Sequence, residues 1–193
     1  MQSVLFDVLP KSGQVERYFS MAAHLKPVVA QNAGFLSVER FANLQKQDWY
    51  LSFSCWKDEE SLAQWRCQPD HNGAQVCGRN QVFNDYRLRV SELKNDNQLL
   101  RKILREWILL LIGQFDEVQA MLCQAPLTRL RSKSYQGVLD TKRGISIIEF
   151  APDVTIDEEL FQLPIPDSVN LFWFEVVRDY GMFDRLEAPT QFS

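Results

Sequence analysis

The residues with the clearest potential for chemistry lie between positions 54 and 75, in the stretch SCWKDEESLAQWRCQPDHNGAQ. This stretch contains two tryptophans, Trp56 and Trp65, and it also contains His71, which is one of only two histidines in the chain. With a reference pKa near 6.5, an imidazole can exchange a proton with a substrate close to neutral pH. A pocket that holds Trp65 and His71 together would therefore be a candidate site for acid–base chemistry.

The same residues also have structural interpretations. Trp56 and Trp65 have the character of core aromatics, and His71 can be a partly exposed residue at the start of a helix. His24, the other histidine, lies beside an apolar helical stripe and is interpreted as structural. The acidic residues 58–60 are interpreted as a helix cap and first-turn charges rather than as a catalytic carboxylate pair.

The spacing of Trp65 and His71 requires a break in the helix between them. An offset of six residues would place the two side chains about 240° apart on a continuous helix. Pro69 lies between them and is expected to interrupt the helix, since proline cannot continue the helical hydrogen-bond pattern. We therefore expect a second helical segment that turns His71 back toward the sheet.

Residues 1–93 predict the element order β-α-β-β-α-β, which is the ferredoxin-like arrangement. Apolar residues at steps of three and four predict the helices, and alternation with a period of two predicts the strands. In the third strand this period puts Tyr50 and Trp56 on one partly apolar face, which must be covered by other residues. The predicted strands are residues 3–8, 35–41, 49–56 and 83–90, and the predicted helices are residues 14–31 and 58–79, the latter interrupted.

After a charged linker at residues 94–106, the pattern starts again, and residues 107–193 are interpreted as a degenerate second ferredoxin-like repeat. The alternative is an unrelated α+β extension. A short region with two prolines, residues 157–166, suggests that any second pocket has collapsed. The predicted strands are residues 107–112, 132–139, 145–150 and 169–177, and the predicted helical segments are residues 115–123 and 157–161.

Composition narrows the class of protein. The 193 residues are 46% hydrophobic and carry 21 basic and 25 acidic residues, with no long block of either charge, so a nucleic-acid partner is not expected. The longest apolar run, residues 107–112, is too short for a membrane span, and the N-terminus has no basic leader. The four cysteines lack metal-site spacing and are expected to be free thiols, so a cytoplasmic protein with no bound metal is predicted.

The motifs GFLSVERF, YLSFSCWKDEESLAQWR, PDHNGAQ and FNDYRLRV resemble the antibiotic biosynthesis monooxygenase domain, and the tail RDYGMFDRLEAP at residues 178–189 resembles the C-terminal end of single-domain members. The resemblance implies the fold of the dimeric α+β barrel superfamily, with a pocket between sheet and helices. A tandem repeat could build this barrel within one chain. We therefore expect an intramolecular pseudo-dimer, with further homo-oligomerisation left open.

The quinone-forming branch of this family is similar in having a tryptophan at the position of Trp65. Its tyrosine six residues later corresponds to His71, its asparagine four residues earlier to Ser61, and its arginine, with a shift of two, to Arg87. The resemblance implies that His71 takes a proton from a phenol, that the anion passes an electron to dioxygen, and that Arg87 stabilises the developing oxyanion. The predicted catalytic residues are His71, Trp65 and Arg87, and the predicted substrate-binding residues are Trp56, Ser61, Tyr50 and Phe6.

The haem-degrading branch fits less well. It is similar in having a second tryptophan nine residues after Trp56, but Gln75 stands where its haem-ligating histidine would be and Phe6 where its asparagine would be. No haem, flavin or other cofactor is therefore expected. Two functions remain open: a cofactor-independent monooxygenase acting on a small aromatic or quinone-like molecule, and a non-catalytic small-ligand-binding or scaffold protein that keeps the barrel fold.

Overall fold

The computed structural model describes residues 1–94 and 105–189. The chain forms two compact units: residues 1–39, 48–90 and 178–193 make up the first, and residues 40–47 and 91–177 the second. Three of the four boundaries fall within strands, and the fourth, between residues 47 and 48, falls in the turn between two strands. Most of the predicted linker, residues 94–106, lies outside the described residues, and the predicted division into domains at this linker stays a prediction.

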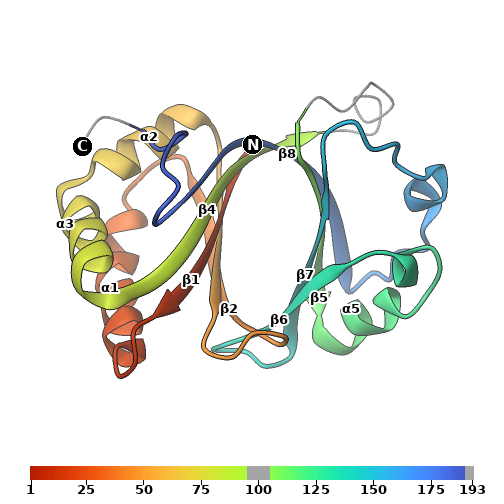
Figure 1. The fold of residues 1–193 in the computed structure, drawn as a ribbon, viewed down its shortest axis with the longest axis horizontal. Coiled ribbons are helices and arrows are strands. Elements are labelled where there is room, and N and C mark those ends of the chain that lie inside the picture. The colour runs from red at the N-terminus through yellow and green to blue at the C-terminus, as the bar shows by residue number, and fades with distance from the viewer. Residues whose placement is uncertain (95–104, 190–193) are drawn as a thin grey trace. The chain divides into compact units, whose positions relative to one another are not determined.

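The first half of the chain has the predicted ferredoxin-like element order (Figure 1). Strands β1 and β3 pair antiparallel, with Leu5 opposite Phe53, and helices lie between β1 and β2 and between β3 and β4. Buried residues alternate along β1 and β3, as the period of two predicts. The elements are β1 (Gln2–Pro10), α1 (Val15–Val29), β2 (Phe35–Asn43), β3 (Tyr50–Trp56), α2 (Glu59–Cys67), α3 (Pro69–Cys77), the π-helical turn η1 (Gly78–Val82) and β4 (Phe83–Lys94).

The second half contains four more strands with shorter helical segments between them (Figure 1). Strand β5 pairs antiparallel with both β7 and β8, and β6 pairs antiparallel with β7. Because β5 is buried along almost its whole length, it reads in the sequence as a continuous apolar run. The elements are β5 (Trp107–Gln114), α5 (Phe115–Leu122), η2 (Leu127–Arg129), β6 (Ser132–Gly137), β7 (Arg143–Phe150), η3 (Glu158–Gln162) and β8 (Val169–Gly181).

The hydrogen-bonded strand order is closed and runs β1-β3-β2-β6-β7-β5-β8-β4. The first four strands of the chain have the spatial order β4-β1-β3-β2, and the last four have the spatial order β8-β5-β7-β6. In both sets, the fourth strand along the chain lies beside the first, the first beside the third, and the third beside the second. The predicted α+β fold, with two ferredoxin-like units in tandem and a barrel-type sheet, is confirmed. A repeat at the level of the sequence stays a prediction.

Strand β8 extends four residues beyond the predicted end at Val177, to Gly181. The added residues begin with the charged pair Arg178 and Asp179, so the apolar alternation that marks the strand in the sequence stops early. In the structure the guanidinium of Arg178 bonds to Glu59 and the carboxylate of Asp179 bonds to Arg87. Ion pairs to α2 and β4 therefore hold this end of the strand, together with the packing of Tyr180 against a buried cluster.

Each unit has its own buried apolar cluster. In the first unit, Phe6, Tyr50 and Leu88 pack against a buried set, and the C-terminal residues Tyr180 and Met182 join them. We call this set the aromatic cluster; its buried members are Val8, Tyr18, Val82, Phe83 and Tyr86. In the second unit, the cluster formed by residues of β5, β7, β8, α5, η2 and η3 consists entirely of apolar and aromatic side chains.

Candidate active site

Three aromatic side chains from consecutive elements contact one another in the first unit. The rings of Trp65 and His71 are stacked, with centroids 4.2 Å apart and an interplanar angle of 17°. Trp65 also stacks on Trp56 at a centroid distance of 6.2 Å, and Phe35 meets Trp56 edge-on at 5.3 Å. The structure therefore brings together two of the predicted catalytic residues and one predicted substrate-binding residue.

The interruption of the helix that makes this contact possible lies at Gln68. Helix α2 ends at Cys67, Gln68 is extended, and α3 begins at Pro69. The side-chain oxygen of Gln68 accepts the backbone N–H of His71 at 2.8 Å, which caps α3. The predicted interruption of the helix at Pro69 is confirmed, and it places His71 over Trp65 despite the offset of six residues.

The hydrogen bonds of His71 define its tautomer. Its Nδ1 lies 3.0 Å from the backbone carbonyl oxygen of Trp65, which can only accept a hydrogen bond, and 3.3 Å from Gln75 Nε2, which can only donate one. The contact with the carbonyl is the shorter of the two and decides the tautomer. Nδ1 therefore carries the proton in the neutral ring, and Nε2 keeps its lone pair. Among residues 1–94 and 105–189, no hydrogen bond to Nε2 occurs.

Burial strongly changes the proton affinity of this imidazole. Desolvation lowers the pKa of His71 from 6.5 to about 4, and the hydrogen bond to the Trp65 carbonyl opposes this shift only in part. The ring is therefore neutral at pH 7. A neutral imidazole with a free lone pair is the form that a general base requires, although its low pKa makes it a weak base.

The side chain of Ser61 is committed to the start of α2. Its Oγ donates to Asp58 Oδ1 at 2.7 Å, and its backbone N–H donates to the same oxygen at 2.8 Å. The Ser61 carbonyl accepts a hydrogen bond from the side-chain amide of Asn32 at 3.0 Å. Asp58 is therefore the cap of α2, as predicted, and Ser61 donates both hydrogen bonds to it. The predicted contact of Ser61 with substrate stays a prediction.

Phe6 and Tyr50 belong to the aromatic cluster. Phe6 lies 5.6 Å from Phe83 and 5.5 Å from Tyr86 between ring centroids, and Tyr50 meets Phe19 edge-on at 5.1 Å. Burial raises the pKa of Tyr50, and the nearby charge of Asp48 raises it further. The predicted substrate-binding residues Phe6 and Tyr50 thus pack against other aromatic rings of this cluster.

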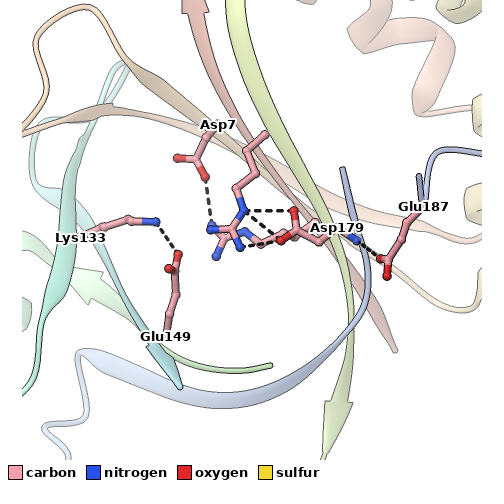
Figure 2. Close-up of polar contacts among 7 residues, drawn as sticks. Asp7, Lys133, Glu149, Asp179 and Glu187 are labelled. Atoms are coloured by element: carbon pink, nitrogen blue, oxygen red, sulfur yellow. Dashed lines mark hydrogen bonds and ion pairs between the residues drawn. The ribbon is translucent and has the colours of Figure 1, made fainter. Parts of the chain in front are cut away.

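Arg87 lies on the other face of β4 from the aromatic cluster, since the neighbouring Tyr86 and Leu88 pack into that cluster. Its Nε is 3.0 Å from both carboxylate oxygens of Asp179, and on the same strand Arg89 is fully buried and bonds to Asp7 at 3.0 Å. Figure 2 shows Asp7 and Asp179 with these two contacts. The structure does not bring Arg87 to the Trp65–His71 stack.

Tyr180 and Met182, which are not among the predicted site residues, pack against the aromatic cluster. They belong to residues 178–189, and Gly181 and Met182 are fixed by backbone hydrogen bonds to Asp184 and Tyr86. The family-like tail motif was the signal that could have identified them. The sequence interpretation placed this tail in the second repeat, residues 107–193, whereas in the structure residues 178–193 belong to the first unit.

Residues 1–94 and 105–189 contain neither a membrane-spanning helix nor a cluster of metal ligands. No helix there is long and apolar enough to cross a membrane. No group of three or more His, Cys, Asp or Glu side chains in residues 1–94 and 105–189 could hold a metal ion. The four cysteines are free, as predicted, whereas the expected cytoplasmic location stays a prediction.

Comparison with known proteins finds similarity to one family model and to one curated protein over nearly the whole chain. Residues 1–76 match the model of the antibiotic biosynthesis monooxygenase family. The resemblance inferred from the sequence motifs is thereby confirmed.

A jasmonate monooxygenase from Pyricularia oryzae is 29% identical to this chain over 216 residues, which cover 98% of this chain and 97% of that protein. An aldoxime dehydratase structure has a TM-score of 0.53 at 8% identity, covering 91% of this chain and 80% of that one, and shows similarity of fold alone. An anthrone oxidase-like protein has a TM-score of 0.41 at 13% identity, covering 97% and 96%. Both sequence matches are thus to monooxygenases.

Proposed function

We propose that this protein is a monooxygenase of the antibiotic biosynthesis type that needs no cofactor and acts on a small aromatic or quinone-like molecule in the first unit. The observation that carries the proposal is the neutral His71 ring, held on Trp65 with the lone pair of Nε2 free. The family match of residues 1–76 and the relative named a jasmonate monooxygenase support the oxygenase class.

In the proposed reaction a phenolic substrate loses its O–H proton to Nε2 of His71. The phenolate passes one electron to dioxygen, and the resulting radical and superoxide combine to form a C–O bond at a ring carbon that bears hydrogen. The imidazolium returns its proton to the distal oxygen of this peroxide. Loss of water, with the ring hydrogen leaving as a proton, gives a quinone, so one phenol and one dioxygen yield one quinone and one water.

The low pKa of His71 is compatible with this role. Proton transfer from a phenol of pKa about 10 to a base whose conjugate acid has a pKa of about 4 costs roughly 8 kcal/mol. A turnover of about one per second allows a total barrier of about 17 kcal/mol. The step is therefore permitted, and substrates with more acidic phenols or hydroquinones are favoured.

The other predicted residues have supporting roles in this proposal. Trp65 and Trp56 support the imidazole and form an aromatic wall, and Phe6 and Tyr50 contribute ring faces of the aromatic cluster. Arg87 is held by Asp179, and this ion pair favours a structural role over the predicted stabilisation of an oxyanion.

A non-catalytic ligand-binding or scaffold protein is the second candidate. It is favoured by the structural partners of three predicted site residues: the Nδ1 of His71 bonds to a backbone carbonyl, the Ser61 hydroxyl donates to the cap residue of α2, and Arg87 is in an ion pair. Such a protein would bind aromatic molecules without consuming oxygen.

Oxygen consumption separates the two candidates. Purified protein is incubated in an oxygen-electrode cell with 1,4-dihydroxynaphthalene, anthrone or jasmonate, and the rate is compared with that of a protein-free sample because hydroquinones oxidise slowly by themselves. The proposal predicts uptake with the first two compounds that His71→Ala reduces at least tenfold and that His24→Ala, a change of the other, exposed histidine, leaves unchanged. Binding without oxygen uptake above the blank would favour the scaffold alternative.

A further inference from the structure

Three arginine side chains of the first unit lie near Tyr180. They come from different parts of the chain: Arg66 from α2, Arg178 from β8 and Arg185 from the segment that follows β8. Glu59 Oε1 lies 2.6 Å from Arg178 Nη2 and 3.9 Å from Arg66 Nη1. One carboxylate therefore faces two guanidinium groups.

Arg185 contacts only neutral groups within the described part of the chain. Its Nη1 donates to the Tyr86 hydroxyl at 2.7 Å, and its guanidinium carbon lies 6.0 Å from the centroid of the Tyr180 ring. Its positive charge is therefore not balanced by a paired carboxylate. A guanidinium held by two phenol rings keeps further N–H donors for a planar anion.

The hydroxyl group of Tyr180 marks where the three positive charges converge. Arg66, Arg178 and Arg185 all favour its ionisation, yet burial outweighs them and raises the pKa of Tyr180 above its usual value. Tyr180 is therefore a neutral hydrogen-bond donor at pH 7. No hydrogen bond of its hydroxyl occurs among residues 1–94 and 105–189, so this donor is available to a ligand.

This basic group borders the aromatic cluster. Tyr180 packs against that cluster, and Tyr86, which accepts the hydrogen bond from Arg185, is one of its buried members and lies 5.5 Å from Phe6. A ligand with its ring on the cluster could therefore extend an anionic group toward Arg185 and Tyr180.

We propose that the ligand of the first unit is an aromatic or similarly flat apolar acid, and that Arg185 binds its carboxylate with Tyr180 as a second donor and Arg178 as a further positive charge. A guanidinium pairs with a carboxylate through two parallel hydrogen bonds, which fixes orientation as well as charge. The inference deepens the proposed function, because it rests on the assignment of the aromatic cluster as the substrate site.

The acidic residues of the same segment have other partners. Glu187 accepts the backbone N–H of Asp179 at 2.6 Å, Asp184 accepts that of Leu186 at 3.3 Å, and Asp179 is paired with Arg87. These carboxylates do not bond to Arg185. The competing explanation is that the arginines only fasten residues 178–189 to the unit, in which case their loss would lower stability without changing the choice of ligand.

The test is a binding measurement with a matched pair of compounds, 2-naphthoate and the uncharged 2-naphthamide, titrated into the full-length protein by calorimetry in low-salt buffer. The wild type should bind naphthoate at least about tenfold more tightly than the amide. Arg185→Met should remove this preference while leaving the Kd of the amide within about twofold, and Arg185→Lys should retain part of it. Arg129→Met, at an exposed arginine of the second unit, serves as the control.

Equal affinities in the wild type, weak or absent binding of both compounds, or a preference that survives in Arg185→Met would overturn the inference. A melting temperature measured for each variant shows whether the fold is intact, and Arg178→Met provides a second variant if Arg185→Met fails to fold. The outcome is independent of the oxygen-uptake experiment, because no turnover is needed. Carboxylate preference without oxygen uptake would retain this inference and reject the monooxygenase, and the reverse result would do the opposite.

Discussion

At the scale of single residues, His71 shows how a fold can hold an imidazole neutral. Its ring is stacked on Trp65, its Nδ1 bonds to the Trp65 carbonyl, and burial lowers its pKa to about 4. In the unfolded chain the pKa of His71 is near 6.5, so the unfolded state binds a proton at this residue before the folded state does as the pH falls.

The pH dependence of stability follows from this difference. The contribution of His71 is fully present above pH 6.5 and is lost as the pH falls from about 6.5 to about 4, since the unfolded state gains the proton in that range. We expect the free energy of unfolding to fall by roughly 1–2 kcal/mol more in the wild type than in His71→Gln between pH 7.5 and pH 4.5. Urea denaturation at the two pH values measures this, and equal losses in both proteins would contradict it.

The contact between Trp65 and His71 should be measurable as a coupling energy. Stacked aromatic pairs contribute about 0.5–1.5 kcal/mol beyond the burial of their surface. In a double-mutant cycle of Trp65→Leu and His71→Ala, we expect the two losses of stability to be non-additive by an amount in this range. The control cycle pairs Trp65→Leu with His24→Ala on α1 and should be additive, and a zero coupling in the first cycle would show that the stack contributes nothing.

At the scale of elements, the sequence predicted the break between α2 and α3 because proline acts locally. The apolar stripe of α1 and the alternation in β1 and β3 were readable for the same reason. The roles of Ser61 and Gln68 were harder to predict, because serine and glutamine suit both a helix cap and a ligand contact. Only the geometry shows that the Ser61 hydroxyl donates to the cap residue Asp58 and that the Gln68 side chain caps α3.

The cap at Gln68 leads to a further prediction. Removing it in Gln68→Ala leaves the His71 N–H without its partner and should cost about 0.5–2 kcal/mol of stability. It should also loosen the imidazole on Trp65, so that any His71-dependent oxygen uptake falls. Gln64→Ala, at an exposed position inside α2, is the matched control and should change stability by less than about 0.5 kcal/mol. Chemical denaturation of the two variants gives the comparison, and similar losses would argue against the cap.

At the scale of the whole molecule, the strand order was predictable from the repeated pattern of elements, but the partners of residues 178–189 were not. Arg178 and Asp179 find Glu59 and Arg87 across more than 90 positions of the chain, and no local pattern encodes such pairs. The predicted site lacked Tyr180 and Arg185 for this reason. Their contribution depends on a segment returning to the first unit after the second half has been completed.

Because residues 178–189 pack against the first unit, we expect a fragment that lacks them to be less stable than the full chain. Residues 1–93 contain all of the first-half elements, but in the full chain Tyr180 and Met182 cover the aromatic cluster and Asp179 pairs with Arg87. A fragment of residues 1–93 should therefore expose apolar rings and lose the ion pair, since burying this surface stabilises by about 25 cal/mol per Å². We expect it to unfold at a markedly lower temperature than the intact protein, or to lack a cooperative transition, when followed by circular dichroism. The matched control is the intact protein with Leu139, an exposed residue of the second half, changed to alanine, which should melt within a few degrees of the wild type. If the fragment melts cooperatively at the temperature of the full chain, residues 178–189 do not contribute to the stability of the first unit.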